Sequence, residues 1–184
     1  EHVAAHLELG AVLQHQAAPE LREQVVVDAV ASALRVAALG GEEPDAVPPA
    51  EQRAVMDRLL TEAKLTQSTY YYGFYLLEAL RKAGLGDRYI ERLEPWRGML
   101  AMGLTTVPEN PEPTRSDSHA WSAHPNYGLL ATVLGVRPDA PGFRSVRIAP
   151  HLGPLQRAEG RIPHPLGDIE VRLVRSGARG LQGE

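Results

Sequence analysis

The chain has 184 residues, 43% of them hydrophobic, with a formal net charge of −4 and no cysteine. That length suffices for one domain with a hydrophobic core, or for one domain with a small appendage. The charge argues against nucleic acid or an anionic membrane as the main partner, and the absence of cysteine excludes disulfide scaffolds, zinc–cysteine sites and thiol catalysis.

Most of the chain reads as helix, because apolar residues recur at helical spacing between Gly- and Pro-containing loops. The segments predicted to be helical are 2–17, 20–39, 50–63, 69–83, 88–102 and 118–134. Pro95 lies inside the fifth segment and should kink or divide it, and Pro125 can make the first turn of the sixth a separate piece. Short connections between helices of this length predict antiparallel hairpins.

The period changes after Arg137, where residues 144–150, 155–164 and 168–176 alternate between polar and apolar. A turn is predicted at 165–167. The side chains predicted to point inward are Val146, Ile148, Ile162, Ile169, Val171 and Leu173. Two or three short strands cannot readily stand alone, so we expect them to pack on the helices or to belong to a larger sheet.

No targeting or membrane-spanning pattern is visible in the sequence. No apolar run approaches the roughly 18 residues needed to cross a membrane, and the first residues do not read as a signal peptide. A cysteine-free chain slightly favours the reducing cytoplasm without establishing it. Because residue 1 is Glu, we expect a fragment whose true N-terminus lies upstream.

Residues 105–127 hold the densest set of chemically active groups. Glu109 lies in a Pro- and Asn-rich loop, where it is either a solvated surface carboxylate or a general base acting on water. His119 and Trp121 lie two apart, and either form a buried structural pair or recognise a sugar through the indole face and the imidazole. Arg115 and Asp117 read as a structural pair that fixes the loop, while Asp117 can alternatively hold a sugar hydroxyl.

Other candidates carry less weight. The tyrosines between residues 70 and 75 are assigned mainly to packing, although any one hydroxyl can reach a pocket. His2 and His6 have the i, i+4 spacing of a metal chelate but lack the HExxH pattern. The motifs of α/β-hydrolases, P-loop proteins and dinucleotide-binding folds are absent.

The stretch over residues 48–175 resembles the C-terminal part of bacterial α-L-rhamnosidases, which are six-hairpin glycosidases. Two elements carry the resemblance most specifically, TTxxE at 105–109 and SxxHAWSAHP at 116–125. The resemblance implies a mainly α fold, with antiparallel helical hairpins from part of an (α/α) six-hairpin barrel over 1–137. A small antiparallel β region over 138–184 would then be the start of a C-terminal β-sandwich domain.

The resemblance also implies roles in an inverting hydrolysis of terminal α-L-rhamnose. Glu109 would be the general base that activates water, His119 would contact the rhamnose, and Trp121 would neighbour the pocket. A second carboxylic acid, about 6.5 to 9.5 Å from the base, protonates the leaving oxygen in such enzymes. In this family that acid lies in the N-terminal half of the barrel, before any residue of this chain. Pro108 stands where the family often has tryptophan, which alters the pocket wall.

The chain is therefore expected to hold the base half of an active site without the acid half, and to be weakly active or inactive alone. Its partner would be a rhamnose-containing glycoside or oligosaccharide, and no cofactor or clear metal site is expected. Half a barrel would expose a large apolar face, which predicts self-association. Two other hypotheses stay open: a non-catalytic carbohydrate-binding or helical interaction module, and a six-hairpin glycosidase with another sugar preference.

Overall fold

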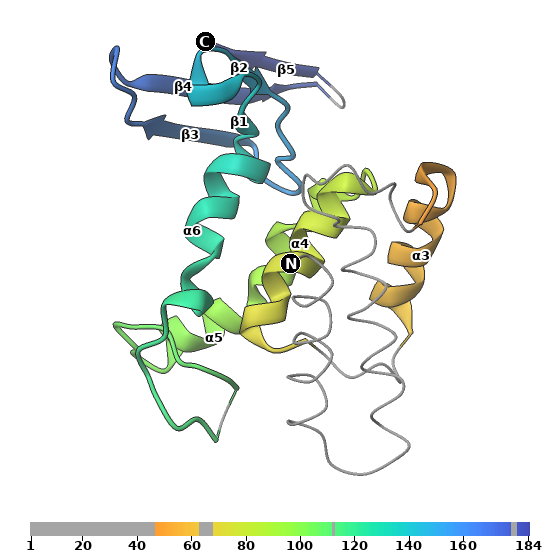
Figure 1. The fold of residues 1–184 in the computed structure, drawn as a ribbon, viewed down its shortest axis with the longest axis vertical. Coiled ribbons are helices and arrows are strands. Elements are labelled where there is room, and N and C mark those ends of the chain that lie inside the picture. Colours follow the sequence, from red (N-terminus) through yellow and green to blue (C-terminus); the bar gives the residue numbers. More distant parts are fainter. Residues whose placement is uncertain (1–46, 63–67, 112, 178–179) are drawn as a thin grey trace, which may run out of the picture.

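The computed structural model describes residues 47–62, 68–111, 113–177 and 180–184. Within these ranges a helical part is followed by a small β region, which lies at one end of the helices (Figure 1). This order confirms the coarse prediction of a helical region followed by antiparallel strands. The helices predicted over 2–17 and 20–39, together with His2 and His6, lie outside the described residues.

The two longest helices among the described residues agree with the predictions for 50–63 and 69–83. They are α3 (Pro49–Thr61) and α4 (Tyr70–Lys82). Pro49 lies in the first turn of α3, where the missing N–H leaves no intrahelical hydrogen bond unmade. These helices and the turns that follow them share one core, whose buried members are Met56, Leu77, Ala79, Leu80, Ala83, Leu85, Tyr89, Ile90 and Val133.

The fifth predicted helix is divided, as Pro95 led us to expect. Two short 3₁₀ turns, η1 (Gly86–Arg88) and η2 (Ile90–Leu93), precede α5 (Glu94–Ala101). Pro95 lies in the first turn of α5, the position where proline is tolerated in a helix. The division leaves α5 short and directs its C-terminal end toward the 105–119 loop.

The sixth predicted helix is also composite. It consists of η3 (Ala120–Ala123), α6 (Pro125–Gly128) and η4 (Leu129–Val133), and η4 is a turn of π-helix that the sequence did not predict. Pro125 begins α6, which confirms a separate first piece. The combined helix runs from the 105–119 loop to the β region, so that this loop and the sheets lie at opposite ends of the helical part (Figure 1).

The β region contains two antiparallel sheets. The smaller sheet pairs β1 (Val136–Pro138) with β2 (Val146–Ile148), and the larger has the order β3 (Arg157–Ile162), β4 (Ile169–Ser176), β5 (Gly180–Gly183). In the β3–β4 hairpin Ile162 pairs with Ile169, on either side of the predicted turn.

Side-chain orientation in the sheets confirms the predicted alternation in β4 and contradicts it in β2. Val171 and Leu173 are buried, as predicted, and Ile162 and Ile169 pack against them. Ile148 was predicted to point inward, but it is 48% exposed. A three-residue strand with one neighbouring strand covers little of its own surface, and Ile148 ends that strand.

The sheets join the helices through a second hydrophobic cluster, whose buried members are Leu134, Val136, Leu152, Val171 and Leu173. Gly135 makes the turn between η4 and β1 with a φ of +79°, and a Cβ at this position would overlap the backbone of Ala149. Glycine is therefore required where the helix ends and the strand begins. In the described part of the chain no helix is long and apolar enough to cross a membrane.

Candidate active site

The candidate site is built on the 105–119 loop, which is closed on itself by backbone hydrogen bonds. The N–H of Glu109 donates to the carbonyl of Ser116 at 2.8 Å, and the N–H of His119 donates to the carbonyl of Val107 at 2.8 Å. These two bonds bring both ends of the loop together. Glu109 and His119, ten positions apart in the sequence, thereby become neighbours.

The peptide before Glu109 is fixed to the η3 turn. The hydroxyl of Ser122 is fully buried and donates to the carbonyl of Pro108 at 2.6 Å. The carbonyl of Ser122 in turn accepts from the indole N–H of Trp96 at 2.7 Å. The backbone that carries Glu109 is thus held by a chain of hydrogen bonds reaching α5.

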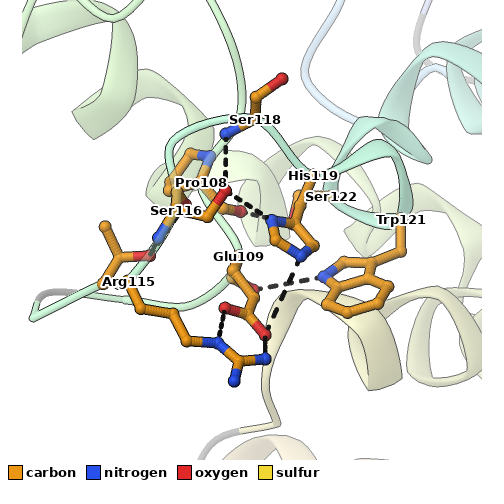
Figure 2. Close-up of polar contacts among 9 residues, drawn as sticks. Pro108, Glu109, Arg115, Ser116, Ser118, His119, Trp121 and Ser122 are labelled. Atoms are coloured by element: carbon orange, nitrogen blue, oxygen red, sulfur yellow. Dashed lines mark hydrogen bonds and ion pairs between the residues drawn. The ribbon is translucent and has the colours of Figure 1, made fainter.

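The carboxylate of Glu109 lies at the centre of the site (Figure 2). The residue is 3% exposed, and both carboxylate oxygens accept hydrogen bonds from Arg115, with Nε donating to Oε2 at 2.5 Å and Nη2 donating to Oε1. These hydrogen bonds lower the pKa of Glu109 below its usual range, outweighing burial, which acts in the opposite direction, and the same contact raises the pKa of Arg115. Glu109 is therefore a carboxylate, and not a carboxylic acid, at neutral pH.

His119 lies between Ser116 and Glu109. Its Nδ1 is 3.0 Å from the hydroxyl of Ser116, and its Nε2 is 3.9 Å from Oε1 of Glu109. The first distance is a hydrogen bond that orients the ring. The second exceeds a direct hydrogen bond and suits one bridging water or ligand hydroxyl.

Trp121 connects the backbone of Glu109 to a wall of aromatic rings. Its indole N–H donates to the backbone carbonyl of Glu109 at 3.3 Å. Its ring centre lies 4.4 Å from that of His119 and 5.6 Å from that of Tyr71. Trp121 is 41% exposed, so part of the indole face is available to a ligand.

Trp121 also lines a hollow of about 310 Å³. Its lining comes from α4 and η3 and consists of Tyr71, Phe74, Tyr75, Ala120, Trp121, Ala123 and His124. Glu109 and Arg115 are not among these residues, and Trp121, which lines the hollow and bonds the Glu109 carbonyl, joins the hollow to the site. Aromatic rings with phenolic hydroxyls form a surface that can hold both faces and edges of a sugar ring.

The five residues predicted from the sequence do not all meet. Glu109, Arg115, His119 and Trp121 come together, as Figure 2 shows. The predicted pair of Arg115 with Asp117 is wrong, because both carboxylate oxygens of Glu109 are nearer partners for the guanidinium. Asp117 is exposed, and its backbone carbonyl accepts a hydrogen bond from Thr106. A sugar-binding role for the Asp117 side chain stays a prediction.

Two further residues belong to the site. Ser116 orients His119, and its place three residues before that histidine was visible in the sequence as part of the SxxH element. Tyr71 packs edge-on against Trp121, but the run of neighbouring tyrosines gave no means of choosing it. Only the approach of α4 to η3 identifies which tyrosine faces the site.

The β region contains a larger hollow of about 590 Å³, lined by residues 138–143 and 162–165. Its one carboxylate, on Asp139, forms an ion pair with Arg147 at 2.8 Å, and most of its lining is proline and apolar. The candidate site is therefore placed at Glu109 because of its ionisable and aromatic side chains, although the hollow in the β region is larger. Among the residues that the structure describes, no group of three or more His, Asp or Glu side chains is placed to hold a metal ion.

Comparison with known proteins points to one family. Residues 135–180 match the family model of the bacterial α-L-rhamnosidase C-terminal domain. An α-L-rhamnosidase from Alteromonas sp. (strain LOR) is 29% identical over 148 residues, an alignment that covers 69% of this chain and 16% of that protein. The chain thus spans a small part of that relative. Both similarities support the resemblance to a glycoside hydrolase, and in particular to the bacterial α-L-rhamnosidases.

Proposed function

We propose that this chain is a piece of an inverting α-L-rhamnosidase, in which Glu109 is the general base. The observation that carries the proposal is a buried carboxylate, bonded to Arg115 and fixed beside His119 and Trp121, with Trp121 also lining an aromatic hollow. A base must be deprotonated before it can take a proton from water, and the lowered pKa of Glu109 meets that condition. The proposal that the sugar is rhamnose rests on the similarity to an α-L-rhamnosidase.

In the proposed reaction Glu109 removes a proton from a water molecule that attacks the anomeric carbon of a terminal rhamnose. The 3.9 Å separation between Glu109 and His119 leaves room for that water or for a sugar hydroxyl. The exposed face of Trp121 would pack on the sugar ring, with Arg115 and Asp117 at the rim. The general acid would come from a segment outside this chain, since inverting enzymes need a second carboxyl about 6.5 to 9.5 Å from the base.

The proposed domain organisation follows from the same relationship. Residues 1–137 would be part of an (α/α) six-hairpin barrel, and residues 138–184 the start of a C-terminal β-sandwich domain. The substrate would be a glycoside or oligosaccharide that ends in rhamnose. Without the acid the isolated chain would hydrolyse little. Self-association through uncovered apolar side chains such as Leu100 and Met102 also stays a prediction.

A second candidate function is a non-catalytic carbohydrate-binding module. The observation that favours it is the occupation of both oxygens of Glu109 by Arg115, because a carboxylate paired in this way is a weak base. In such a module Trp121 and Tyr71 would hold the sugar, and Glu109 would serve to fix the loop. The two candidates differ in what happens when Glu109 loses its charge.

The test is hydrolysis of an aryl α-L-rhamnoside by the full reading frame that contains this chain. We expect Glu109→Gln to lower kcat by about 10²- to 10⁴-fold, the contribution typical of general-base catalysis. The matched control is Glu159→Gln on an exposed position of β3, which should leave turnover unchanged. An active wild type with an unaffected Glu109→Gln variant would remove Glu109 as base. A wild type that binds rhamnose but is inactive would favour the binding module, and activity on another aryl glycoside would favour a different sugar preference.

A further inference from the structure

The carboxylate of Glu109 and the guanidinium of Arg115 are held very differently. Glu109 is buried, its N–H is bonded to Ser116, and its carbonyl accepts from Trp121. The side chain of Arg115 is 80% exposed. Among the described residues, the hydrogen bonds and the ion pair of that guanidinium all go to Glu109. One partner of the ion pair is thus fixed by the fold, and the other is anchored only through the pair itself.

This asymmetry determines what breaking the pair would cost. An arginine with most of its surface in water regains hydration when it leaves, so exposed ion pairs contribute little to stability. The carboxylate would remain in place because its backbone is held independently of Arg115. Its two oxygens would then be free to accept hydrogen bonds from a ligand that donates them, and the hydroxyls of a sugar are such donors.

The position of the pair sets Arg115 in competition with a ligand that approaches the carboxylate from the side of Arg115. Arg115 covers both oxygens of Glu109, while His119 approaches the carboxylate from another side and Trp121 contacts the backbone carbonyl of Glu109 (Figure 2). His119 is the other titratable side chain that faces the carboxylate among the described residues, and its Nε2 is too distant to replace Arg115. One water fits between Oε1 and His119 while Arg115 stays in place, but a ligand hydroxyl that donates to Glu109 from the side of Arg115 needs the acceptor site that Arg115 now occupies.

We propose that Arg115 is a displaceable counterion of Glu109, which leaves at least one carboxylate oxygen when a hydroxyl-bearing ligand binds beside Trp121. The proposal rests on the proposed function in that the ligand is a sugar. Arg115 is then a positioning residue. It keeps Glu109 ionised and correctly oriented in the empty site, and it gives way to the ligand.

The direct test follows the Nε–H resonance of Arg115 by NMR while the 184-residue chain is titrated with L-rhamnose. The indole N–H resonance of Trp121 reports whether the sugar binds. We expect both resonances to move together, with that of Arg115 approaching the position of a solvated arginine. If the indole resonance moves and that of Arg115 does not, the sugar binds beside Trp121 without displacing Arg115, and the proposal is overturned.

An acid titration tests the counterion even if neither rhamnose nor other monosaccharides bind, an outcome that would count against the proposed function alone. Protonation of Glu109 removes the charge that holds Arg115. We expect the Arg115 resonance to reach its solvated position while the Trp121 indole resonance keeps its dispersed shift. If the indole resonance collapses to the unfolded position at the same step, Arg115 is a structural lock of the loop and the proposal fails.

Substitutions of Arg115 measure how strongly it competes with the ligand. Arg115→Met removes the competitor, so it should bind rhamnose about two- to fivefold more tightly at neutral pH, the range expected for an exposed ion pair. Arg115→Lys should restore affinity close to that of the wild type. Arg147→Met is the matched control, because Arg147 pairs with Asp139 at an exposed site in the β region. Weaker binding by Arg115→Met would make Arg115 a sugar contact and overturn the proposal.

Discussion

Two buried glutamates of this chain each accept hydrogen bonds from arginine, but in different surroundings. Glu109 lies in the 105–119 loop, and its partner Arg115 is almost fully in water. Glu78 lies in α4, is 5% exposed, and accepts from Arg137 at 2.5 Å and from Arg81 at 3.3 Å. The side chain of Arg137 is only 22% exposed. A glutamate–arginine ion pair is thus solvent-exposed on its arginine side at one end of the helical part, and largely buried at the other end.

The junction between helices and sheets holds Arg137 from several directions. Its Nε donates to the carbonyl of Ala131 at 2.9 Å, and its guanidinium lies 5.6 Å from the ring centre of Tyr127. Nearby, Tyr89 has a buried hydroxyl without a hydrogen-bond partner among the described residues, and burial raises its pKa. Burial of a carboxylate therefore does not by itself mark a functional site. What distinguishes Glu109 is a cation that can leave and an imidazole and an indole within reach.

The largest effect on stability is expected at the packed pair. Arg137→Met leaves Glu78 buried with Arg81 as its remaining charged partner, and breaking a buried pair typically costs about 3 to 5 kcal/mol. Chemical denaturation of the chain should show a loss of that order. Arg115→Met should cost much less, because an exposed ion pair contributes about 0 to 1 kcal/mol. Equal losses in the two variants would remove the distinction between the regions.

The turn at Gly135 should show the next largest effect, again at the junction. Alanine there must adopt a positive φ and also overlap the backbone of Ala149, for a combined cost of about 2 to 4 kcal/mol. Gly142 is the matched control, since its φ is +70° but a Cβ would meet no atom within 4 Å. Gly142→Ala should therefore cost about 1 to 2 kcal/mol in the same denaturation experiment. If both variants lose the same amount, the close approach of Gly135 to Ala149 is absent in solution.

Substitutions around the 105–119 loop should change ligand affinity more than they change stability. Trp121→Ala removes the aromatic face beside Glu109, and we expect rhamnose affinity to fall by about two- to tenfold, the size of an aromatic contact. Isothermal titration measures the change. Leu166→Ala is the control, because Leu166 is highly exposed in the β3–β4 turn and far from the site. Unchanged affinity in Trp121→Ala would place the sugar elsewhere.

The smallest expected effect compares a histidine in each region. Burial is the main cause that lowers the pKa of both His124, beside α4 at the site, and His151, beside Gly86 at the junction. The unfolded chain then takes up protons at a higher pH than the folded chain, so stability is complete above a pH of about 6.5 and falls as the pH decreases below it.

Denaturation curves between pH 7.5 and 5.5 measure this dependence, and each histidine should contribute less than about 1 kcal/mol. His124→Gln and His151→Gln should each flatten the slope, and their effects should add because the two residues lie in different regions. A slope that neither variant changes would show that neither imidazole is buried.

The local features of this fold were largely readable from the sequence. Alternation along residues 155–176 predicted the β3–β4 hairpin, and Pro95 and Pro125 marked where helices divide. These are short-range signals, since proline geometry and strand periodicity act over a few residues. The exposure of Ile148 was not readable, because it depends on which elements cover β2.

The candidate site was readable in its residues but not in its pairings. Glu109, His119 and Trp121 were chosen from two sequence elements, yet Arg115 was paired with Asp117 and not with Glu109. The contact between Glu78 and Arg137 joins residues 59 positions apart, and no local pattern predicts it. The choice of partner depends on how the loop closes and how helices meet sheets, which tertiary packing decides.

The most direct test of the central distinction measures turnover and stability together for Glu109→Gln and Glu78→Gln in the full reading frame. We expect a crossed pattern. Glu109→Gln should lose turnover of an aryl α-L-rhamnoside by orders of magnitude while its melting temperature stays close to that of the wild type. Glu78→Gln should melt at a clearly lower temperature and keep its turnover per folded molecule. Loss of stability without loss of turnover in Glu109→Gln would contradict the assignment of Glu109 as general base, because Glu109 would then be a structural residue like Glu78.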